Sequence, residues 1–320
     1  MDEHPMTKVW FLNKLVIVTK DADFIHKVFN SQKVYDKPNV FYQGFLVEKG
    51  LIVMSGAEHK RHRKILNKAF TSKMMQRLPD IFDEKSMKIL DLLEERMDCG
   101  EFELTDYIGA YSFEAFGKSN FNYEINYYDS EIFRAYKGYC SLIVDTLPFL
   151  IVGLDRKFLN LLNLGKSLTK IEKTFDEFFD DVRKTNQEIA FETTTKTIST
   201  ALMMLGMHKD VQQKAVNEIE AIYSQDANSE FSADFLQKFT YLELILKETM
   251  RLFAVAPIVA RETSDEVSIN GYLIPKNTTI IISINAMHRD EKYWGTDADQ
   301  FRPERFEEEL KNPHACPYPV

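Results

Sequence analysis

Hydrophobic positions in this 320-residue chain follow two different periods. Near the N-terminus, residues 9–12 and 15–18 are short apolar stretches on either side of Asn13 and Lys14, which predicts a β-hairpin. Over a helical body at residues 56–256, apolar side chains recur every three or four positions, the spacing of an amphipathic helix. The pattern predicts helices over residues 58–70, 80–97, 166–183, 188–207, 211–222 and 242–252. A shorter helix is predicted over residues 21–30, before the body.

The pattern changes after Pro257. Two short apolar stretches flank Asn270 and Gly271, a pair that suits a type I′ turn, and predict a second hairpin over residues 267–274. Residues 278–284 are rich in β-branched side chains and predict a strand, whereas the last thirty residues are polar and predict coil. We therefore expect a mainly α fold with a small β region (α+β).

The two β-rich parts of this fold lie near residues 8–18 and 266–284, close to opposite ends of the chain. The simplest arrangement brings them together beside the helical body. With 44% hydrophobic residues, the chain can form a sizeable core in one large domain or in two smaller ones, and we expect one domain over residues 1–320. The single domain is expected to be incomplete, for the reason given below.

Composition and charge exclude several classes of protein. The 24 Phe and 14 Tyr are too many for a disordered chain, and a net charge of −9 argues against a general nucleic-acid binder. The three cysteines, at positions 99, 140 and 316, include no CxxC pair, so neither a disulfide framework nor a cysteine zinc site is predicted. The longest apolar run, residues 142–154, contains Asp145 and Pro148 and is too short to span a bilayer. We expect no membrane anchor in this chain and an intracellular location.

The first chemical signal comes from charged residues in the C-terminal third. Glu248 and Arg251 stand three residues apart, where side chains of one helix meet, although such pairs are common on protein surfaces. About fifty residues later comes the segment Phe301-Arg302-Pro303-Glu304-Arg305-Phe306. Between the two motifs lie Arg261, the predicted hairpin and the triplet His288-Arg289-Asp290.

This ordered set resembles the cytochrome P-450 family, the haem-thiolate monooxygenases. The resemblance implies a partial cytochrome P-450 fold. It also implies that Glu248, Arg251 and Arg305 form a buried ion network that supports the haem-binding region. Two cations and one anion can satisfy each other's hydrogen bonds, whereas losing one of them leaves a buried charge unpaired.

A basic helix near the N-terminus carries the next resemblance. Residues 56–64 are similar to the family pattern GxxWxxxRK, whose Trp and Arg reach a haem propionate. Arg63 matches the Arg, and His59 stands where Trp is usual, a position from which an imidazole can still donate a hydrogen bond. Arg261 matches the family's second propionate arginine. Without these motifs, the same stretch also fits a solvated basic face or a nucleic-acid patch.

Residues 189–194 resemble the family's central helix, where an acid and a threonine carry protons to bound dioxygen. The resemblance assigns catalytic roles to Glu192 and Thr193, because proton delivery needs a hydroxyl beside a titratable group. Ile189 occupies the position of a Glu that attaches haem covalently in some relatives, so no such ester is expected. The structural alternative is a threonine-rich helix start with Glu192 in its first turn.

The chain departs from the family pattern in two places. The family's iron ligand is a Cys in an FxxGxRxCxG loop after the PERF segment, and this sequence has no such loop; Cys316, beside Pro317, is a poor substitute. We therefore expect no metal ligand in this chain. The link over residues 183–188 is also far shorter than in the family. The resemblance thus implies a chain truncated at both ends and shortened internally, similar to the microsomal fatty-acid-hydroxylase-like branch of insect type.

The resemblance implies a haem cofactor and oxidation of a lipophilic small molecule, with dioxygen and electrons from an NADPH-dependent reductase at the endoplasmic reticulum membrane. An acidic reductase could dock on a basic cluster, which is otherwise a solvated charge run: Lys60, Arg61, Lys64, Lys68 and Lys73. The alternative is a truncated, non-catalytic relative that cannot hold haem and acts through binding. An unrelated helical interaction protein is the third hypothesis.

Overall fold

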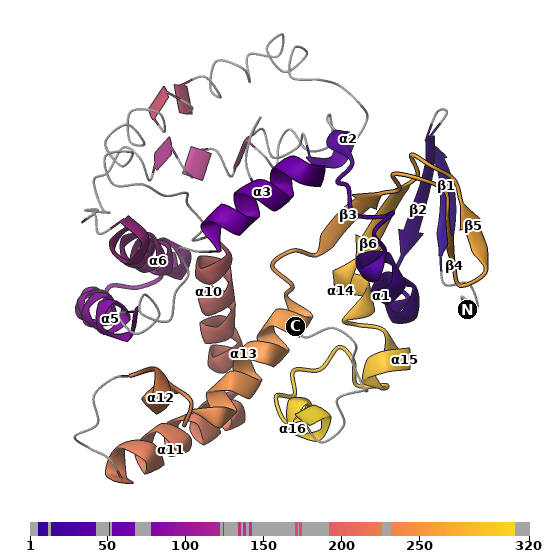
Figure 1. Cartoon of the computed structure of the whole chain (residues 1–320). Helices are drawn as coiled ribbons and strands as arrows, with labels where there is room; N and C mark the ends of the chain where they lie inside the picture. The colour runs from indigo at the N-terminus through magenta and orange to yellow at the C-terminus, as the bar shows by residue number, and fades with distance from the viewer. Residues whose placement is uncertain are drawn as a thin grey trace.

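The structure of the chain, a computed structural model, describes residues 6–11, 14–42, 51, 53–67, 78–121, 124, 134–135, 137–138, 141–142, 170–171, 173–174, 192–225 and 232–310. These residues form a helical body beside a small β region, as Figure 1 shows. The expected mainly α fold with a small β region is therefore confirmed.

A four-stranded sheet joins the two ends of the chain. Its strand order is β1-β2-β6-β3, with β1 (Thr7–Phe11) and β2 (Lys14–Thr19) from the N-terminal part, and β3 (Ile258–Glu262) and β6 (Thr279–Ser283) from the C-terminal part. Strand β2 runs parallel to β6, and β6 pairs with β3 in antiparallel fashion. The β region is thus built from segments far apart in the sequence, as expected.

The core of the β region is aliphatic and is covered by one helix. Ile17, Ile280 and Ile282 are buried in the sheet, and α1 (Ala22–Asn30) packs Phe24 and Val28 into the same cluster. Helix α1 begins where the Asp21 side chain accepts a hydrogen bond from the Phe24 backbone N–H, a usual N-cap. The sheet and α1 therefore form a unit that holds β3 in place.

The second hairpin has the predicted turn. Strand β4 (Val267–Ile269) pairs with β5 (Tyr272–Ile274) in antiparallel register. Asn270 and Gly271 between them have φ angles of 52° and 79°, and a type I′ turn requires positive φ at both of its central positions.

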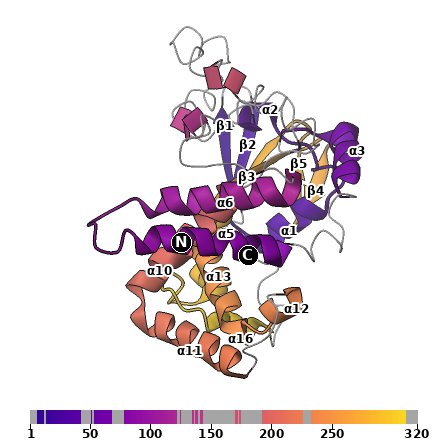
Figure 2. The same ribbon diagram turned by 90° about the vertical axis from the view of Figure 1, so that its left-hand side faces the viewer.

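The helical body contains most of the remaining described residues. Helices α5 (Leu78–Glu94) and α6 (Leu104–Phe121) lie side by side, and α10 (Glu192–Met207) packs against α6 and α13 (Thr240–Leu252), as Figure 2 shows. Helix α11 (Lys209–Gln225) packs against α10 and α13, and its residues Val211 and Ala215 are buried there. The short helices α2 (Asn39–Tyr42), α3 (Gly56–Leu66) and α12 (Ala233–Leu236) complete the body. The predicted helix 166–183 lies outside the described residues, apart from 170–171 and 173–174.

The prediction of coil for the last thirty residues was wrong in part. Helices α15 (Glu291–Trp294) and α16 (Arg305–Leu310) form there, and α14 (Ile284–Met287) precedes them. Trp294 and Phe306 are buried against Leu244 of α13, so packing of two aromatic rings overrides a polar local sequence. Residues 311–320 lie outside the described part of the chain.

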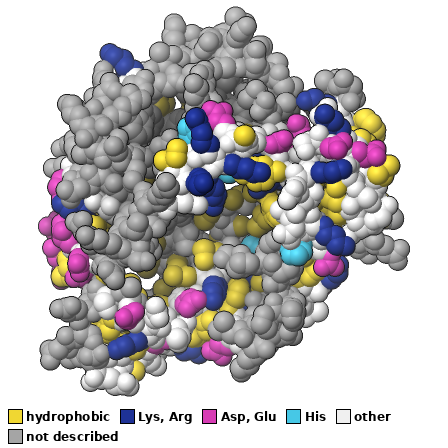
Figure 3. All heavy atoms as spheres, viewed as in Figure 1, with side chains coloured by type: hydrophobic (Ala, Val, Ile, Leu, Met, Phe, Trp, Pro, Cys, Tyr) yellow, Lys and Arg dark blue, Asp and Glu magenta, His cyan; other side chains and the backbone are white. Residues whose placement is uncertain are grey.

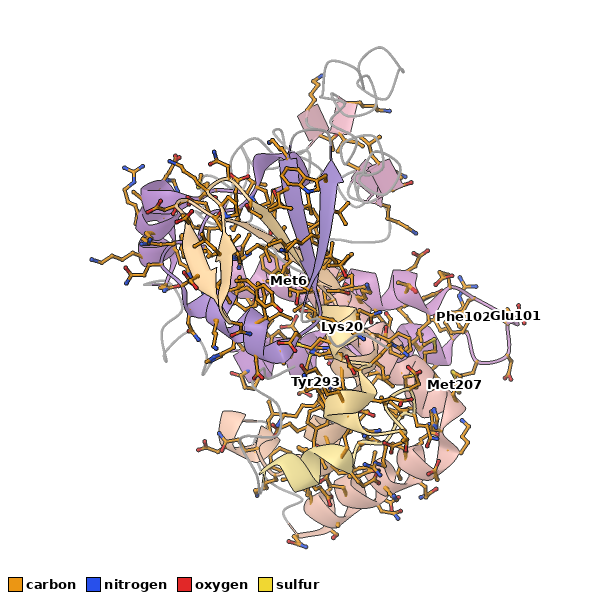
Figure 4. All side chains as sticks on the ribbon, turned by 90° about the vertical axis from the view of Figure 1, so that its right-hand side faces the viewer. Met6, Lys20, Glu101, Phe102, Met207 and Tyr293 are labelled. Carbon is orange, nitrogen blue, oxygen red and sulfur yellow. The ribbon has the colours of Figure 1, made fainter. Side chains whose placement is uncertain are left out.

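The C-terminal helices also contact the start of the chain. Lys20, at the end of β2, pairs with Asp290 at 3.1 Å, and the hydroxyl of Tyr293 accepts a hydrogen bond from the Ala22 backbone N–H at 3.0 Å. Figure 4 shows Lys20 and Tyr293 at this junction, whereas Glu101 and Phe102 lie at the far tip of the α5–α6 connection.

Candidate functional site

The structure brings Glu248, Arg251 and Arg305 together in the interior. Glu248 and Arg251, both on α13, are fully buried, and Arg305, at the start of α16, is 5% exposed. The Glu248 carboxylate accepts two hydrogen bonds from Arg251, at 2.6 and 2.8 Å, and one from Arg305 Nε at 3.1 Å. The pair at i and i+3 is therefore not a surface pair.

Every charged group in this network has further partners. Arg251 Nη1 donates to the backbone carbonyls of His288 and Ala298, each at 2.6 Å, and its guanidinium lies 4.9 Å from the centre of the Trp294 ring. Arg305 donates to the Trp294 carbonyl at 3.1 Å and to the Asp297 carboxylate at 3.3 Å. A buried charge is tolerated when its hydrogen bonds are satisfied, so this cluster binds the segment 288–305 to α13.

No sequence motif pointed to Asp297 or to the backbone carbonyls. Asp297 also pairs with Arg302 at 3.2 Å, and the two arginines lower the pKa of its carboxyl group, Arg305 first. His288 is buried as well, and burial lowers the pKa of its imidazole to about 4. It was visible in the sequence only as part of the triplet at 288–290.

A second group of charged residues lines an open cleft between α3 and β3. Arg63 and His59 come from α3, Arg261 from β3, and Lys37 from the segment between α1 and α2. The cleft has a volume of about 510 Å³, and its other lining residues are Phe29, Val34, Tyr35 and Leu51. Among these described lining residues, Lys37, Arg63 and Arg261 are cationic and none is acidic. Figure 3 shows Lys and Arg side chains gathered on this part of the surface, at the upper edge of a central hollow.

His59 is held in the cleft by a tyrosine. It is 8% exposed, and its Nδ1 lies 2.6 Å from the hydroxyl of Tyr35. Burial lowers the pKa of His59, as do the charges of Lys37, Arg63 and Arg261, so the imidazole is neutral at pH 7. When Tyr35 donates to Nδ1, the proton of the neutral ring is on Nε2, which makes His59 a donor.

Arg261 is oriented by groups of the sheet and α1. Its Nη1 donates to the Ala260 carbonyl at 2.9 Å, and its guanidinium lies 5.1 Å from the centre of the Phe29 ring. Stacking on an aromatic ring leaves the edge of a guanidinium open to acceptors. Three sequence-predicted residues, Arg63, His59 and Arg261, thus share one cleft with Lys37 and Tyr35, which the sequence analysis missed. Only an alignment of the segment before α3 could have pointed to those two residues.

The proposed catalytic pair lies at the start of α10. The Thr193 side chain is exposed, and its carbonyl accepts a hydrogen bond from Thr197 Oγ1 at 2.9 Å. Glu192 is the first residue of the helix, but its side chain is not among those that the structure describes. Thr193 is not among the described residues that line the cleft.

No group of three or more potential metal ligands occurs in the part of the chain that the structure describes. Cys99 is an exposed free thiol, and Cys140 and Cys316 lie outside that part. Among the described residues, no helix has the length and apolar character needed to cross a membrane.

Comparison with known proteins decides the family. The family model described as cytochrome P-450 matches residues 2–190 and 190–318. The chain belongs to the cytochrome P-450 family. It is therefore assigned to the haem-thiolate monooxygenases, which are oxidoreductases with haem as their cofactor. The two matches meet at residue 190, close to the link over residues 183–188 that the sequence analysis found too short.

The relatives include insect and mammalian P-450 proteins. A Drosophila melanogaster protein named probable cytochrome P-450 313a4 is 26% identical over 360 aligned residues, which cover 96% of this chain and 72% of the relative. Cytochrome P-450 3A6 of Oryctolagus cuniculus is 27% identical, with 95% and 71% of the two chains covered. Probable cytochrome P-450 4d20 of Drosophila melanogaster is 24% identical, with 96% and 72% covered. These matches favour the P-450 hypothesis over an unrelated interaction protein.

The cleft fits one end of the haem group. Haem carries carboxylates, and the described lining of the cleft offers three cationic side chains and an imidazole donor, and no acid. The residues that would hold the carboxylates are Arg63, Arg261, His59 and Lys37. When bound, the haem iron supplies the oxygen chemistry that amino-acid side chains cannot.

Proposed function

We propose that this chain uses the cleft between α3 and β3 to bind the haem of a monooxygenase that oxidises a lipophilic small molecule. The observation that carries the proposal is the convergence of Arg63, Arg261 and His59 on one cleft whose described lining residues include no acid. In this proposal the two arginines neutralise the haem carboxylates, and His59 donates from Nε2.

The buried network of Glu248, Arg251 and Arg305 has a supporting role in the proposal. It joins α13 to the segment that leads into α16, and β3, which carries Arg261, follows α13 directly in the chain. Because the network holds α13 in place, it also fixes the direction in which the chain continues from α13 into β3. Glu192 and Thr193, at the start of α10, deliver protons in this account.

Electrons come from a reductase that docks on the basic face of α3. Lys60, Arg61 and Lys64 are exposed on this helix, and opposite charge on a partner would steer the encounter. Lys68 and Lys73 of the same cluster lie outside the described residues. A microsomal location and a fatty-acid-like substrate complete the proposal, on the strength of the family alone.

A spectrum tests the proposal. The chain is expressed with a supply of haem, reduced and exposed to carbon monoxide, and haem content and Soret position are recorded. Haem that copurifies supports the assignment of the cleft, and a red-shifted Soret band would show in addition that a thiolate binds the iron. A chain that retains no haem favours the non-catalytic alternative.

Variants show whether the cleft is responsible for haem binding. Arg63→Met and Arg261→Met should each lower haem content several-fold. Arg302→Met should not, because Arg302 pairs with Asp297 and is not among the described residues that line the cleft. Equal haem content in all three variants would contradict the assignment of the cleft.

A further inference from the structure

Strand β1 is an exposed edge of the four-stranded sheet. It stands at one end of the strand order, and β2 is its only partner among the strands that the structure describes. Val9 and Trp10 are 45% and 68% exposed, and Thr7 and Lys8 are exposed as well. The β4–β5 hairpin belongs to a separate sheet and packs on the face that α1 covers. An edge of this kind presents unpaired backbone groups to which another strand can bind.

The register of the β1–β2 hairpin shows which backbone groups of β1 are unpaired. Its last pair is Phe11 with Lys14, and two residues separate them in the chain. A pair that closes so short a connection exchanges both of its hydrogen bonds, and so does every second pair along an antiparallel ladder. Phe11 and Val9 therefore direct their N–H and C=O groups toward β2. Lys8 and Trp10 direct theirs to the open side of the strand.

The sequence of β1 is complementary to itself. When two copies of the strand pair antiparallel about Val9, each Lys8 lies opposite Trp10 of the other copy, and their outward backbone groups form a hydrogen-bonded pair. An ammonium beside an indole ring is a favourable cross-strand contact. Lysine on an edge strand commonly prevents pairing, but in this register it meets an aromatic ring and not a second lysine. Lys8 already lies 6.0 Å from the centre of the Tyr272 ring within its own chain.

We propose that β1 is an interaction surface for a second copy of this chain, which pairs with it antiparallel about Val9 and extends the sheet across a two-fold axis. The inference is independent of the proposed function, because no residue of β1 is among the described residues that line the cleft. One strand from each copy buries little surface, so the dimer is weak and dissociates on dilution.

Cysteine cross-linking tests the register of this dimer. The two copies of Val9 lie opposite each other in a pair without hydrogen bonds, where Cα atoms are about 4.5 Å apart, within the range of a disulfide. Thr7 is also exposed, but it lies opposite Phe11 of the other copy, so its two copies are too far apart for a disulfide. Val9→Cys and Thr7→Cys are each made in a full-length chain whose cysteines at 99, 140 and 316 are replaced by serine.

On mild oxidation, Val9→Cys should form a covalent dimer on a non-reducing gel, and Thr7→Cys should stay monomeric. Cross-linking of both variants to the same extent, or of neither, would contradict pairing about Val9.

Sedimentation equilibrium over a range of protein concentrations measures the self-association itself. Two variants remove the same indole ring: Trp10→Lys places a lysine opposite Lys8 of the other copy, and Trp10→Glu places an opposite charge there. Because each contact occurs twice in the dimer, Trp10→Lys should raise the dissociation constant about tenfold or more, whereas Trp10→Glu should change it by about threefold or less. Adding Lys8→Glu to Trp10→Lys should restore the dimer, since the two charges are then opposite again.

Two results would overturn the proposal. One is a wild-type chain that stays monomeric at every concentration, and the other is equal association of Trp10→Lys and Trp10→Glu. A lipid surface is a different ligand for an exposed tryptophan. A shift of Trp10 fluorescence to shorter wavelength with phosphatidylcholine vesicles, in a chain that does not self-associate, would assign β1 to a membrane instead. Circular dichroism of each variant shows that a loss of association is not a loss of folding.

Discussion

The molecule contains two clusters of arginines that differ in how their charges are satisfied. In the interior, Arg251 and Arg305 share Glu248 and donate further hydrogen bonds to backbone carbonyls, and Arg305 also donates to the Asp297 carboxylate. In the cleft, Arg63 and Arg261 share their surroundings with Lys37, and no acid is among the lining residues that the structure describes. We infer that a buried arginine whose N–H groups all have acceptors in the protein stabilises the fold. Arginines that lie together without an anion bind a negatively charged ligand. The predictions below test this difference, beginning with the largest effect.

Removing the anion of the buried network should be the most damaging change. Glu248→Ala leaves two buried guanidinium groups without their carboxylate, at a cost of about 5 kcal/mol, comparable to the whole stability of many domains. We expect an insoluble or unfolded protein, detected by circular dichroism. Glu243→Ala, on the same helix but with an exposed side chain, is the control. A Glu248→Ala variant that melts as the control does would refute the role of the network.

Removing one of its cations should cost less. In Arg305→Met, the Glu248 carboxylate still accepts hydrogen bonds from Arg251 and from the backbone N–H of Arg302, so it keeps hydrogen-bond partners. Asp297 loses one partner but keeps Arg302. We expect the free energy of unfolding to fall by about 3 kcal/mol. Denaturant unfolding measures it, with Arg302→Met, whose side chain is half exposed, as the neighbouring control; equal stability of the two variants would contradict the buried assignment.

Acid should weaken the network through His288. Its pKa of about 4 in the folded chain is below the ordinary value near 6.5, so the unfolded chain takes up the proton first as the pH falls. Stability from this group is complete above pH 6.5 and is lost between pH 6.5 and 4, by about 2 kcal/mol at pH 5. Unfolding experiments at pH 7 and pH 5 measure the loss.

The control for acid sensitivity is a second histidine. His288→Gln should make unfolding less dependent on pH over this range, whereas His26→Gln, at an exposed position of α1, should leave the dependence as it is. An unchanged slope in His288→Gln would show that other groups cause the acid sensitivity.

Changes in the cleft should have the smallest effect on stability. Arg63 is exposed, and its charge lowers the pKa of both Lys37 and His59, so removing it relieves repulsion. We expect Arg63→Met to change the free energy of unfolding by about 0.5 kcal/mol or less. Thermal melting without haem measures this change, and a large destabilisation would assign Arg63 to the scaffold.

Sequence patterns predicted the parts of the fold that depend on local chemistry. The Asn270-Gly271 turn formed as predicted because its backbone geometry requires those residue types. Helices α11 and α13 formed where apolar side chains recur at helical spacing. The C-terminal helices were missed because their stability comes from Trp294 and Phe306 packing on α13, which a local pattern does not contain.

The same limit applies to helix faces and to the site. Phe29 and Leu90 are apolar residues within the predicted helices 21–30 and 80–97, yet they are 37% and 56% exposed, since spacing alone does not show which side a neighbouring element covers. The family motifs pointed to Arg63, Arg261 and Glu248. Lys37 and Asp297 belong to no motif, and only the folded chain brings them beside the motif residues.

The most direct test of this account measures two quantities on the same two variants. Arg305→Met and Arg63→Met are each examined for unfolding free energy and for the preference of the chain for haemin over its dimethyl ester. The account predicts a crossed result: Arg305→Met loses about 3 kcal/mol of stability, and Arg63→Met keeps its stability but loses about tenfold in haemin affinity. If Arg63→Met binds haemin as the wild-type chain does, or unfolds as readily as Arg305→Met, the distinction between the two arginine clusters is wrong.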